Sequence, residues 1–568
     1  MNNQKKLLLA VALLLGSNLL QPGTSAQSTQ PLRMNPASTD GITVSPAQPA
    51  VQNREVNKKV RESLSEALDA IRKNHVNGKT LNYNHLFKSA FTVMLHSLDP
   101  HSNYYDAKEL DGLRTHPRVG SVGIGLTIDA RKIGGETGIF VLAPLQNSTA
   151  ATAGLRFGDK ITAVDNWDVK GHSLEEVREK LRGGPGTQVK LSIERAADNV
   201  TQTVAVTRAV LTQPSVPDAY ILRPGVGYID LSQGFKLDTA NELIANLDKL
   251  QREGMTSLVL DLRENQGGLL IQAISVADQF VSEGQLIVRQ TGRKPRLADL
   301  QYKAQNRTPR NYPLAVLVNH KTASGAEIVA GTLQDHDRAL IVGEPTFGQS
   351  VVQSVIPLQY GSALALTISK LILPSGRLIQ RDYSQLGYHD YQSRRQHGRN
   401  EAGAAVSQER RVEWKTDTGR SVYGGEGLMP DEVVEPRVIS DLEQRMIDPI
   451  FGFVRELVNG RAGGFESYLV PRPIDFTKVV QPDEFAVKDD LFKAFKDFVG
   501  RTQRYNLTEK DLDGHREFIA RQMRYDIVTA AYGSIMAARV LRADDPQVQR
   551  AVEVLPRAAQ LATAPRNR

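Results

Sequence analysis

Ser324 is a candidate nucleophile for an acyl-transfer reaction, because a serine hydroxyl can attack a carbonyl carbon. Ser324 lies in the segment 321–328 (Lys-Thr-Ala-Ser-Gly-Ala-Glu-Ile), where an apolar run ends and a helical pattern begins. A hydroxyl at a helix N-terminus lies near unpaired amides and the positive end of the helix dipole, which favours an attacking oxygen. Serine is also a common N-cap, so this position alone fits either a cap or a nucleophile.

A glycine-rich segment forms a second strand-to-helix junction. Residues 261–268 (Asp-Leu-Arg-Glu-Asn-Gln-Gly-Gly) follow an apolar run and precede a helical stretch. Glycines at such a junction place main-chain N–H groups where they can face a ligand. The two junctions together indicate a site built from backbone donors and one hydroxyl.

A third glycine segment opens a compact, mainly β module. Residues 123–126 (Gly-Ile-Gly-Leu) are followed by 153–159 (Ala-Gly-Leu-Arg-Phe-Gly-Asp) and 181–183 (Leu-Arg-Gly). In this order the motifs resemble a PDZ domain of the bacterial type. The resemblance implies that a peptide adds a strand to the sheet edge. It also implies that the peptide's terminal carboxylate is bound by the backbone of Gly123, Ile124, Gly125 and Leu126.

Apolar periodicity predicts the elements that position these residues. Continuous apolar runs at 257–262, 314–319 and 339–343 alternate with helical stretches, which indicates a mostly parallel sheet covered on both faces. Helical spacing also begins at Val56 and returns beyond Ser440. The predicted fold class is multidomain α/β, with an N-terminal helical segment, a PDZ-like β module, an α/β core with a mostly parallel sheet and a C-terminal helical domain.

The 568 residues allow three or four compact units. The expected divisions are a signal peptide over 1–26, a flexible linker over 27–55, an N-terminal helical domain over 56–115, a PDZ domain over 116–211, a core over 212–439 with a polar insert at 386–411, a C-terminal helical domain over 440–545 and a tail over 546–568.

Composition narrows the class of protein. Lys5 and Lys6 precede a short apolar run and small residues before Gln27, which is typical of a secretory signal. We therefore expect an exported protein, periplasmic or secreted, without a stable membrane span. The chain has no cysteine, which excludes disulfides and thiolate catalysis. A net charge of +7 without basic blocks argues against nucleic acid, and the scattered histidines predict neither a metal nor a cofactor.

The order of motifs over about 56–438 resembles the tail-specific, or C-terminal processing, serine peptidases. That family implies a Ser/Lys dyad and a glutamine that orients the lysine. The corresponding positions here are Ser324 as nucleophile, Gln349 at the base position and Gln353 as the orienting glutamine. The oxyanion donors would be the N–H groups of Gly325 and of Gly267 or Gly268. The expected partners are polypeptides with exposed C-termini.

The base position departs from the family. Family members usually have Thr-Phe-Gly-Lys-Gly where residues 346–350 are Thr-Phe-Gly-Gln-Ser. A carboxamide is not basic enough near neutral pH to accept the serine proton. Lys321, His320 and Lys370 are other basic residues, but none has the family's position.

Three interpretations follow from this departure. The chain is an impaired serine-type peptidase that works through its oxyanion hole and binding effects, a peptidase that recruits another base, or a noncatalytic PDZ-bearing adaptor that binds C-termini.

Overall fold

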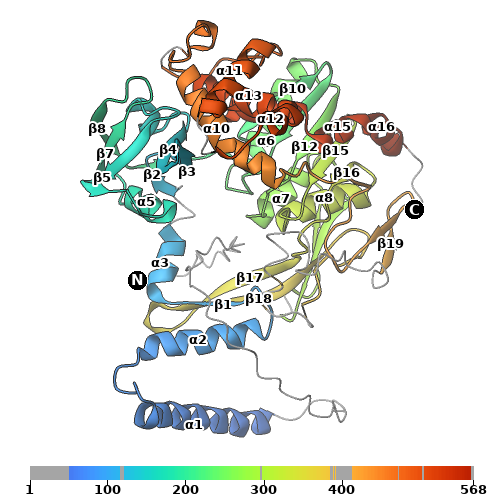
Figure 1. Ribbon diagram of the computed structural model, residues 1–568. Helices are drawn as coiled ribbons and strands as arrows, with labels where there is room; N and C mark the ends of the chain where they lie inside the picture. Colours follow the sequence, from blue (N-terminus) through green and yellow to red (C-terminus); the bar gives the residue numbers. More distant parts are fainter. Residues whose placement is uncertain are drawn as a thin grey trace, which may run out of the picture.

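The computed structural model describes residues 50–563, apart from 116–120, 295–296, 384–387, 389–390, 392–411, 471–472 and 502–504. The predicted signal peptide, the linker up to residue 49 and the insert over 386–411, except Tyr388 and Tyr391, lie outside the described residues. The predicted fold class is confirmed, with N-terminal helices, a PDZ-like β module, an α/β core and C-terminal helices in that order (Figure 1). Among the described helices, none is long and apolar enough to cross a bilayer.

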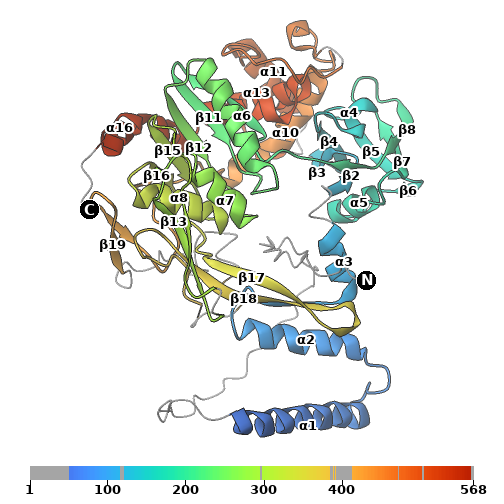
Figure 2. The same ribbon diagram turned by 180° about the vertical axis from the view of Figure 1, so that it is seen from behind.

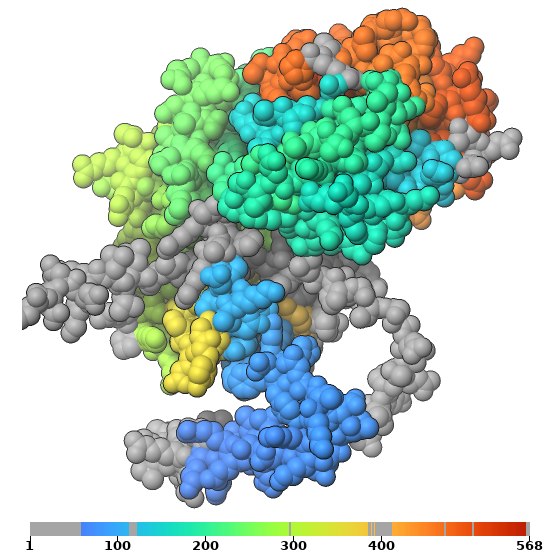
Figure 3. Space-filling view, turned by 90° about the vertical axis from the view of Figure 1, so that its left-hand side faces the viewer, coloured from blue at the N-terminus to red at the C-terminus, as the bar shows by residue number. Residues whose placement is uncertain are grey.

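The first described elements form a helical arm that projects from the body of the molecule (Figures 1 and 3). Helix α1 (Ala50–Asn74) starts ahead of the predicted Val56, so residues 50–55 are helical and do not belong to a linker. Those six residues include no glycine or proline, so a helix nucleated by the apolar stripe downstream can extend through them. Helix α2 (Tyr83–His96), strand β1 (Asn103–Tyr105) and helix α3 (Ala107–Thr115) follow.

The β module has an antiparallel sheet in the order β3-β4-β5-β7-β8. Strand β3 is therefore an edge strand, and Arg178 of helix α5 (Leu174–Leu181) reaches it, with Nη2 3.5 Å from the carbonyl of Ile128. An open strand edge beside a helix is the geometry that strand addition requires. The strands are β2 (Ser121–Gly123), β3 (Leu126–Ile133), β4 (Glu136–Pro144), β5 (Lys160–Val164), β6 (Trp167–Asp168), β7 (Gln188–Glu194), β8 (Thr201–Thr207) and β9 (Ala209–Leu211), and a short helix α4 (Thr149–Thr152) follows β4.

The core sheet has the order β10-β11-β12-β15-β16-β21, and every neighbouring pair is parallel except β10 with β11. Leu258 and Leu260 of β12 pack against helices on one face, whereas Val259 packs against helices on the other. The strands are β10 (Asp218–Arg223), β11 (Val226–Asp230), β12 (Ser257–Asp261), β15 (Leu314–Val318), β16 (Leu340–Gly343) and β21 (Glu432–Val433). The first face is covered by α6 (Thr239–Arg252), α7 (Leu270–Ala277) and α8 (Gly325–Asp335), as Figure 2 shows.

A second, antiparallel sheet lies below the core in Figure 1 and was not predicted. It joins β1 of the N-terminal arm to strands that are more than 180 residues away in the sequence. Its main strands are β13 (Leu286–Gly292), β14 (Leu300–Lys303), β17 (Val351–Pro357) and β18 (Ala363–Ile372), and a separate hairpin is formed by β19 (Glu413–Lys415) and β20 (Ser421–Tyr423).

The C-terminal helices contact both other parts of the body. Phe451 packs on Phe140 and Phe157 of the β module, with ring centroids 5.4 and 4.9 Å apart. Thr508 and Asp511 form a capping box at the start of one of these helices, and Ile519, Met523 and Ile527 of the next helix are fully buried. The helices are α10 (Asp441–Leu457), α11 (Asp489–Arg501), α12 (Glu509–Gly514), α13 (Arg516–Tyr532) and α14 (Ser534–Ala543).

The predicted tail over 546–568 is helical as far as residue 563. Helix α15 (Pro546–Glu553) has Asp545 as its N-cap and proline in its first turn, and α16 (Leu555–Thr563) follows. Apolar residues of both helices, including Val548, Ala551 and Ala558, bury the second face of the core sheet. That burial explains the ordered helices, because an isolated helix of this length is marginal in water.

Candidate active site

Ser324 lies at the turn between β15 and α8 in a strained backbone conformation, with φ 56° and ψ −118°. Non-glycine residues rarely adopt a positive φ and hold it only where the surroundings enforce it. The side chain is buried, at 1% exposure. Its Oγ is buried and has no hydrogen-bond partner among the described residues.

The glycine-rich segment lies directly against Ser324. A Cβ atom added to Gly267 would lie 2.8 Å from the Ser324 Cβ and 3.0 Å from the Gly325 nitrogen. Gly267 also has φ +90°, which other residues rarely adopt. The structure therefore brings together Ser324, Gly325 and Gly267, three of the residues named as site candidates from the sequence.

Asn265 ties this segment to its neighbours. Its buried side chain accepts from the Gly267 N–H at 2.8 Å and donates to the Leu231 carbonyl at 2.5 Å. Its own carbonyl accepts from the N–H of Ala323, the residue before the serine, at 2.9 Å. The Gly267 N–H is thus already used within the segment.

The Gly268 N–H is directed differently. The Gly267 carbonyl accepts from the Phe235 N–H at 2.8 Å. A trans peptide holds its carbonyl and N–H on opposite sides, so the Gly268 N–H points away from Phe235. Of the two predicted glycines, Gly267 therefore has its amide engaged within the segment, which leaves the Gly268 amide as the candidate oxyanion donor.

Glu327 holds the backbone of Gln349 close to Ser324. Its Oε2 accepts from the N–H groups of Ser324 at 2.9 Å and of Gln349 at 2.8 Å. Because both amides contact one oxygen atom, residues 324 and 349 are neighbours in space, as the family spacing implies. Glu327 was not among the site residues expected from the sequence, although its place three residues after a helix N-cap is a capping signal.

The carboxylate of Glu327 is fully buried and is held by neutral donors. Its Oε1 accepts from the Gly348 N–H at 2.7 Å and from the Thr346 hydroxyl. Burial raises the pKa of Glu327 to about 6, against the effect of these hydrogen bonds. The loop 346–349 is thus fixed through its backbone, whatever side chain residue 349 carries.

Gln353 contacts the N-terminal arm. Its side-chain amide donates to the carbonyl of His101, which precedes β1. The His101 ring contacts the hydroxyl of Tyr391 at 3.0 Å, and that hydroxyl also accepts from Gln380. A buried chain of hydrogen bonds therefore joins the N-terminal arm to the strand that carries Gln353. No local sequence motif predicts this contact.

The other basic residues considered from the sequence have partners elsewhere. The ammonium of Lys321 is 2.9 Å from a Glu264 carboxylate oxygen, and the His320 ring is 3.2 Å from Glu344. Lys370 is exposed on β18. Each is placed as expected for a structural or solvated side chain.

The predicted carboxylate-binding loop of the β module turns its carbonyls inward. The Ile124 carbonyl accepts from the Ala150 N–H at 2.9 Å, and the Gly125 carbonyl from the Leu145 N–H at 2.8 Å. The N–H groups of Gly125 and Leu126 consequently point the opposite way. Gly125 has φ +72°, and a Cβ there would lie 2.3 Å from the Ser148 Cβ, so a glycine is required.

These features define an α/β protein with an attached PDZ module and a serine at a strained turn. Comparison with known protein families identifies two parts of the chain. Residues 225–385 match peptidase family S41, and residues 113–194 match the PDZ domain. The carboxy-terminal-processing protease of Bartonella bacilliformis is 36% identical over 52% of this chain and 67% of its own length. The carboxyl-terminal-processing protease of a Picosynechococcus species is 35% identical over 51% and 68%.

A solved structure is also similar. The photosystem II D1 C-terminal processing protease is 27% identical, aligned over 67% of this chain and 92% of that chain, with a TM-score of 0.35. On the sequence matches, the chain belongs to the C-terminal processing proteases of peptidase family S41.

Proposed function

We propose that the chain is an exported serine-type endopeptidase that cleaves polypeptides recognised by their free C-termini. Family membership supports the class of reaction. The observation that carries the assignment to this site is the buried Ser324 hydroxyl, unpartnered within the described residues, at a strained turn against Gly267. Export rests on the sequence of residues 1–26.

In this proposal the β module binds the substrate terminus and Ser324 attacks an internal peptide carbonyl. The negative charge that develops on the carbonyl oxygen is bound by the N–H groups of Gly325 and Gly268. These donors are fixed before the substrate arrives, so they cost no rearrangement during the reaction. The serine proton must reach the leaving amine for the cycle to close.

Transfer of the Ser324 proton is the step for which this site has the least suitable side chain. Gln349 occupies the position of the family's lysine, and a carboxamide cannot act as the base. We therefore propose a slow enzyme that relies on its oxyanion donors and on substrate binding, effects that can retain roughly 10³–10⁴-fold over water.

The test is hydrolysis of an unfolded polypeptide with an apolar C-terminus by the purified mature protein. We expect slow cleavage that Ser324→Ala abolishes. The same substrate with an amidated C-terminus should bind more weakly, because the Gly125 and Leu126 amides lose the carboxylate. Cleavage that persists in Ser324→Ala would exclude this serine as the nucleophile.

The glutamine at position 349, where the resemblance implies a lysine, also favours a second function, that of a binding protein. A noncatalytic adaptor would keep the edge of β3 beside α5 and use it to hold peptide tails. It would bind free-acid peptides with ordinary affinity and show no Ser324-dependent cleavage, even after prolonged incubation.

A further inference from the structure

Arg263 joins the glycine-rich segment to the C-terminal helices. On one side its Nε and Nη2 bind the Asp261 carboxylate, with the Nη2 to Oδ2 distance 2.6 Å. On the other side Nη1 donates to Asp545 Oδ2 at 2.6 Å and to Gln547 Oε1 at 2.9 Å. A single guanidinium therefore bridges the end of β12 and the start of α15.

The bridge is well shielded from water. The Arg263 side chain is 16% exposed, Asp261 7% and Asp545 22%. Burial alone would raise the pKa of Asp261, but the Arg263 guanidinium and the Tyr228 hydroxyl hold it below its ordinary value. Partly buried, bidentate arginine contacts of this kind fix geometry better than exposed ion pairs do.

The segment that follows Arg263 needs to be held. Glu264 has φ +63°, a strained conformation for a residue with a side chain. The next residue, Asn265, contacts Gly267 and Ala323 as described above. A shift at Arg263 would therefore be transmitted over a few bonds to the Gly267–Gly268 peptide and to the turn of Ser324.

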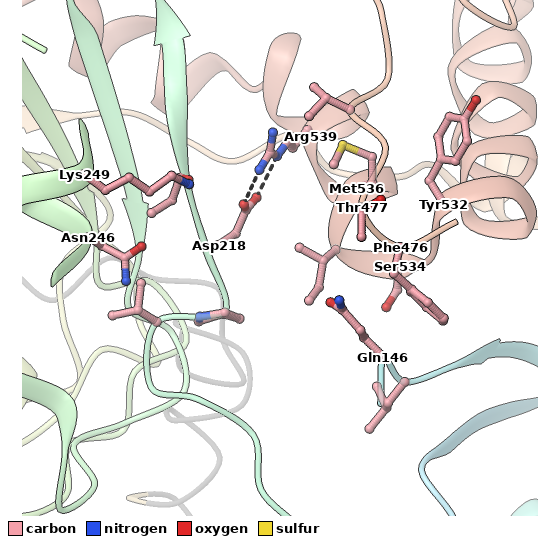
Figure 4. Close-up of a pocket in the computed structure, with 16 residues that line it drawn as sticks. Gln146, Asp218, Asn246, Lys249, Phe476, Thr477, Tyr532, Ser534, Met536 and Arg539 are labelled. Carbon is pink, nitrogen blue, oxygen red and sulfur yellow. Dashed lines mark hydrogen bonds and ion pairs between the residues drawn. The ribbon is translucent and has the colours of Figure 1, made fainter. Parts of the chain in front are cut away.

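Helix α15 is a firm anchor for this contact. Its apolar face packs on the core sheet together with α16 (Figure 1). Gln547 is almost fully buried and also donates to the Val434 carbonyl at 2.7 Å. Arg539 attaches the preceding helix α14 to the core through an ion pair with Asp218 at 2.6 Å. This ion pair borders a cavity of about 350 Å³ between the core, the β module and the C-terminal helices (Figure 4).

We propose that Asp545 and Gln547 are positioning residues for the reaction: through Arg263 they set the place of the segment that supplies the Gly268 N–H. The C-terminal helices would then complete the active site without touching substrate. This inference rests on the proposed function, because it assigns the segment to oxyanion binding.

The test variant is Asp545→Ser in the full chain. Asp545 Oδ1 caps α15 by accepting from the N–H groups of Gln547 and Val548, and serine preserves a cap while it is too short to reach Arg263. The matched control is Glu432→Gln. Glu432 binds Arg550 of the same helix at 2.8 Å, and no hydrogen bond or ion pair of the described residues joins it to the segment 261–268.

Two readouts separate positioning from general stability. Hydrogen exchange of amides in 262–268 should become at least about ten-fold faster in Asp545→Ser and stay unchanged in Glu432→Gln. In the hydrolysis assay, kcat should fall about ten- to a hundred-fold with KM unchanged, because misplacement by about 1 Å can cost that much. Affinity of the β module for a free-acid peptide should not change.

The outcomes decide between the two proposals. Unchanged exchange in Asp545→Ser, or faster exchange with unchanged kcat, would overturn the positioning role. If no variant hydrolyses substrate, the proposed function fails, while the exchange comparison still decides whether α15 holds the segment. Should Asp545→Ser fail to fold, Gln547→Met removes one acceptor of Arg263 and leaves the cap intact, with the same expectations.

Discussion

The two segments that flank Ser324 differ in how they would contribute to the reaction. The segment 261–268 contributes backbone amides, and it keeps the two glycines and the asparagine that shape it. In the segment 346–353 the resemblance to the family implies a lysine as the basic side chain, whereas this sequence has Gln349. Substitution at one side chain can thus remove proton transfer while the backbone donors stay in place.

The buried carboxylates of the two segments, Asp261 and Glu327, are stabilised by different kinds of partner. Asp261 is paired with a guanidinium, which holds its pKa low. Among the described residues, Glu327 accepts hydrogen bonds from backbone N–H groups and one hydroxyl, and burial raises its pKa to about 6. The first segment is therefore fixed by an ion pair, and the second by a capping carboxylate that binds a proton readily.

The largest expected effect comes from restoring the base. Glu327 holds the backbone of residue 349 beside Ser324, so Gln349→Lys should place an amine where the family has one. General-base catalysis contributes about 10²–10⁴-fold, and we expect hydrolysis to rise by a factor in that range. The measurement is initial rates on an unfolded substrate.

Two controls accompany Gln349→Lys. Gln349→Met has a similar size without an amine and should give no gain, and Ser324→Ala in the lysine background should abolish it. Ser350 stands where the resemblance implies a glycine, and its hydroxyl donates to the Leu371 carbonyl at 2.5 Å, so Gln349→Lys is also made with Ser350→Gly. No gain in either form would favour the adaptor.

A smaller effect is expected from crowding the other segment. Gly267→Ala introduces a Cβ 2.8 Å from the Ser324 Cβ. In the Gln349→Lys background we expect hydrolysis to fall about 10²–10³-fold, the usual cost of disturbing one oxyanion donor. Initial rates and the melting temperature are measured together.

The control for backbone strain is Gly254→Ala. Gly254 has φ +91°, close to that of Gly267, but a Cβ there meets nothing within 4 Å. Both variants should lose stability by about 1–2 kcal/mol from the strained conformation. Equal activity losses in the two would show that the close contact with Ser324 does not matter.

Much of this arrangement was readable from the sequence because its signals are local. Buried apolar runs predicted β12 and β15, and glycines at their ends predicted junctions at Gly267 and Ser324. The prediction failed where chemistry depends on distant partners. Nothing near Gln353 indicates that it binds the carbonyl of His101, and nothing near Arg263 indicates Asp545.

The same reason explains the missed elements. Strand β1 has three residues and acquires its identity only by pairing with β18. Helices α15 and α16 were taken for a tail because the stretch contains proline and arginine, and they are ordered by the sheet face that they cover. Periodicity predicts an element, but it does not predict which surface the chain returns to.

The smallest expected effect is the pH dependence of the Glu327 contact. The folded-state pKa of about 6 lies above the ordinary value of 4.5, so the folded protein binds more protons than the unfolded chain between these values. The stability of α8 and its loop should be full below about pH 4.5 and fall as the pH rises through 6, by about 2 kcal/mol at 1.36 kcal/mol per unit.

Glu327→Gln isolates this contribution, because a carboxamide does not titrate. Native-state hydrogen exchange of α8 gives the local opening free energy at each pH, and the wild-type value minus the variant value is followed from pH 4 to pH 7. Loss of an acceptor in the variant offsets the two curves by a constant, so the slope is the readout. We expect the difference to fall by about 2 kcal/mol across that range. A difference that rises with pH would mean that the hydrogen bonds from Ser324, Gly348 and Gln349 outweigh burial. The contrast between this carboxylate and the arginine-paired Asp261, whose contribution is lost as the pH falls, would then disappear.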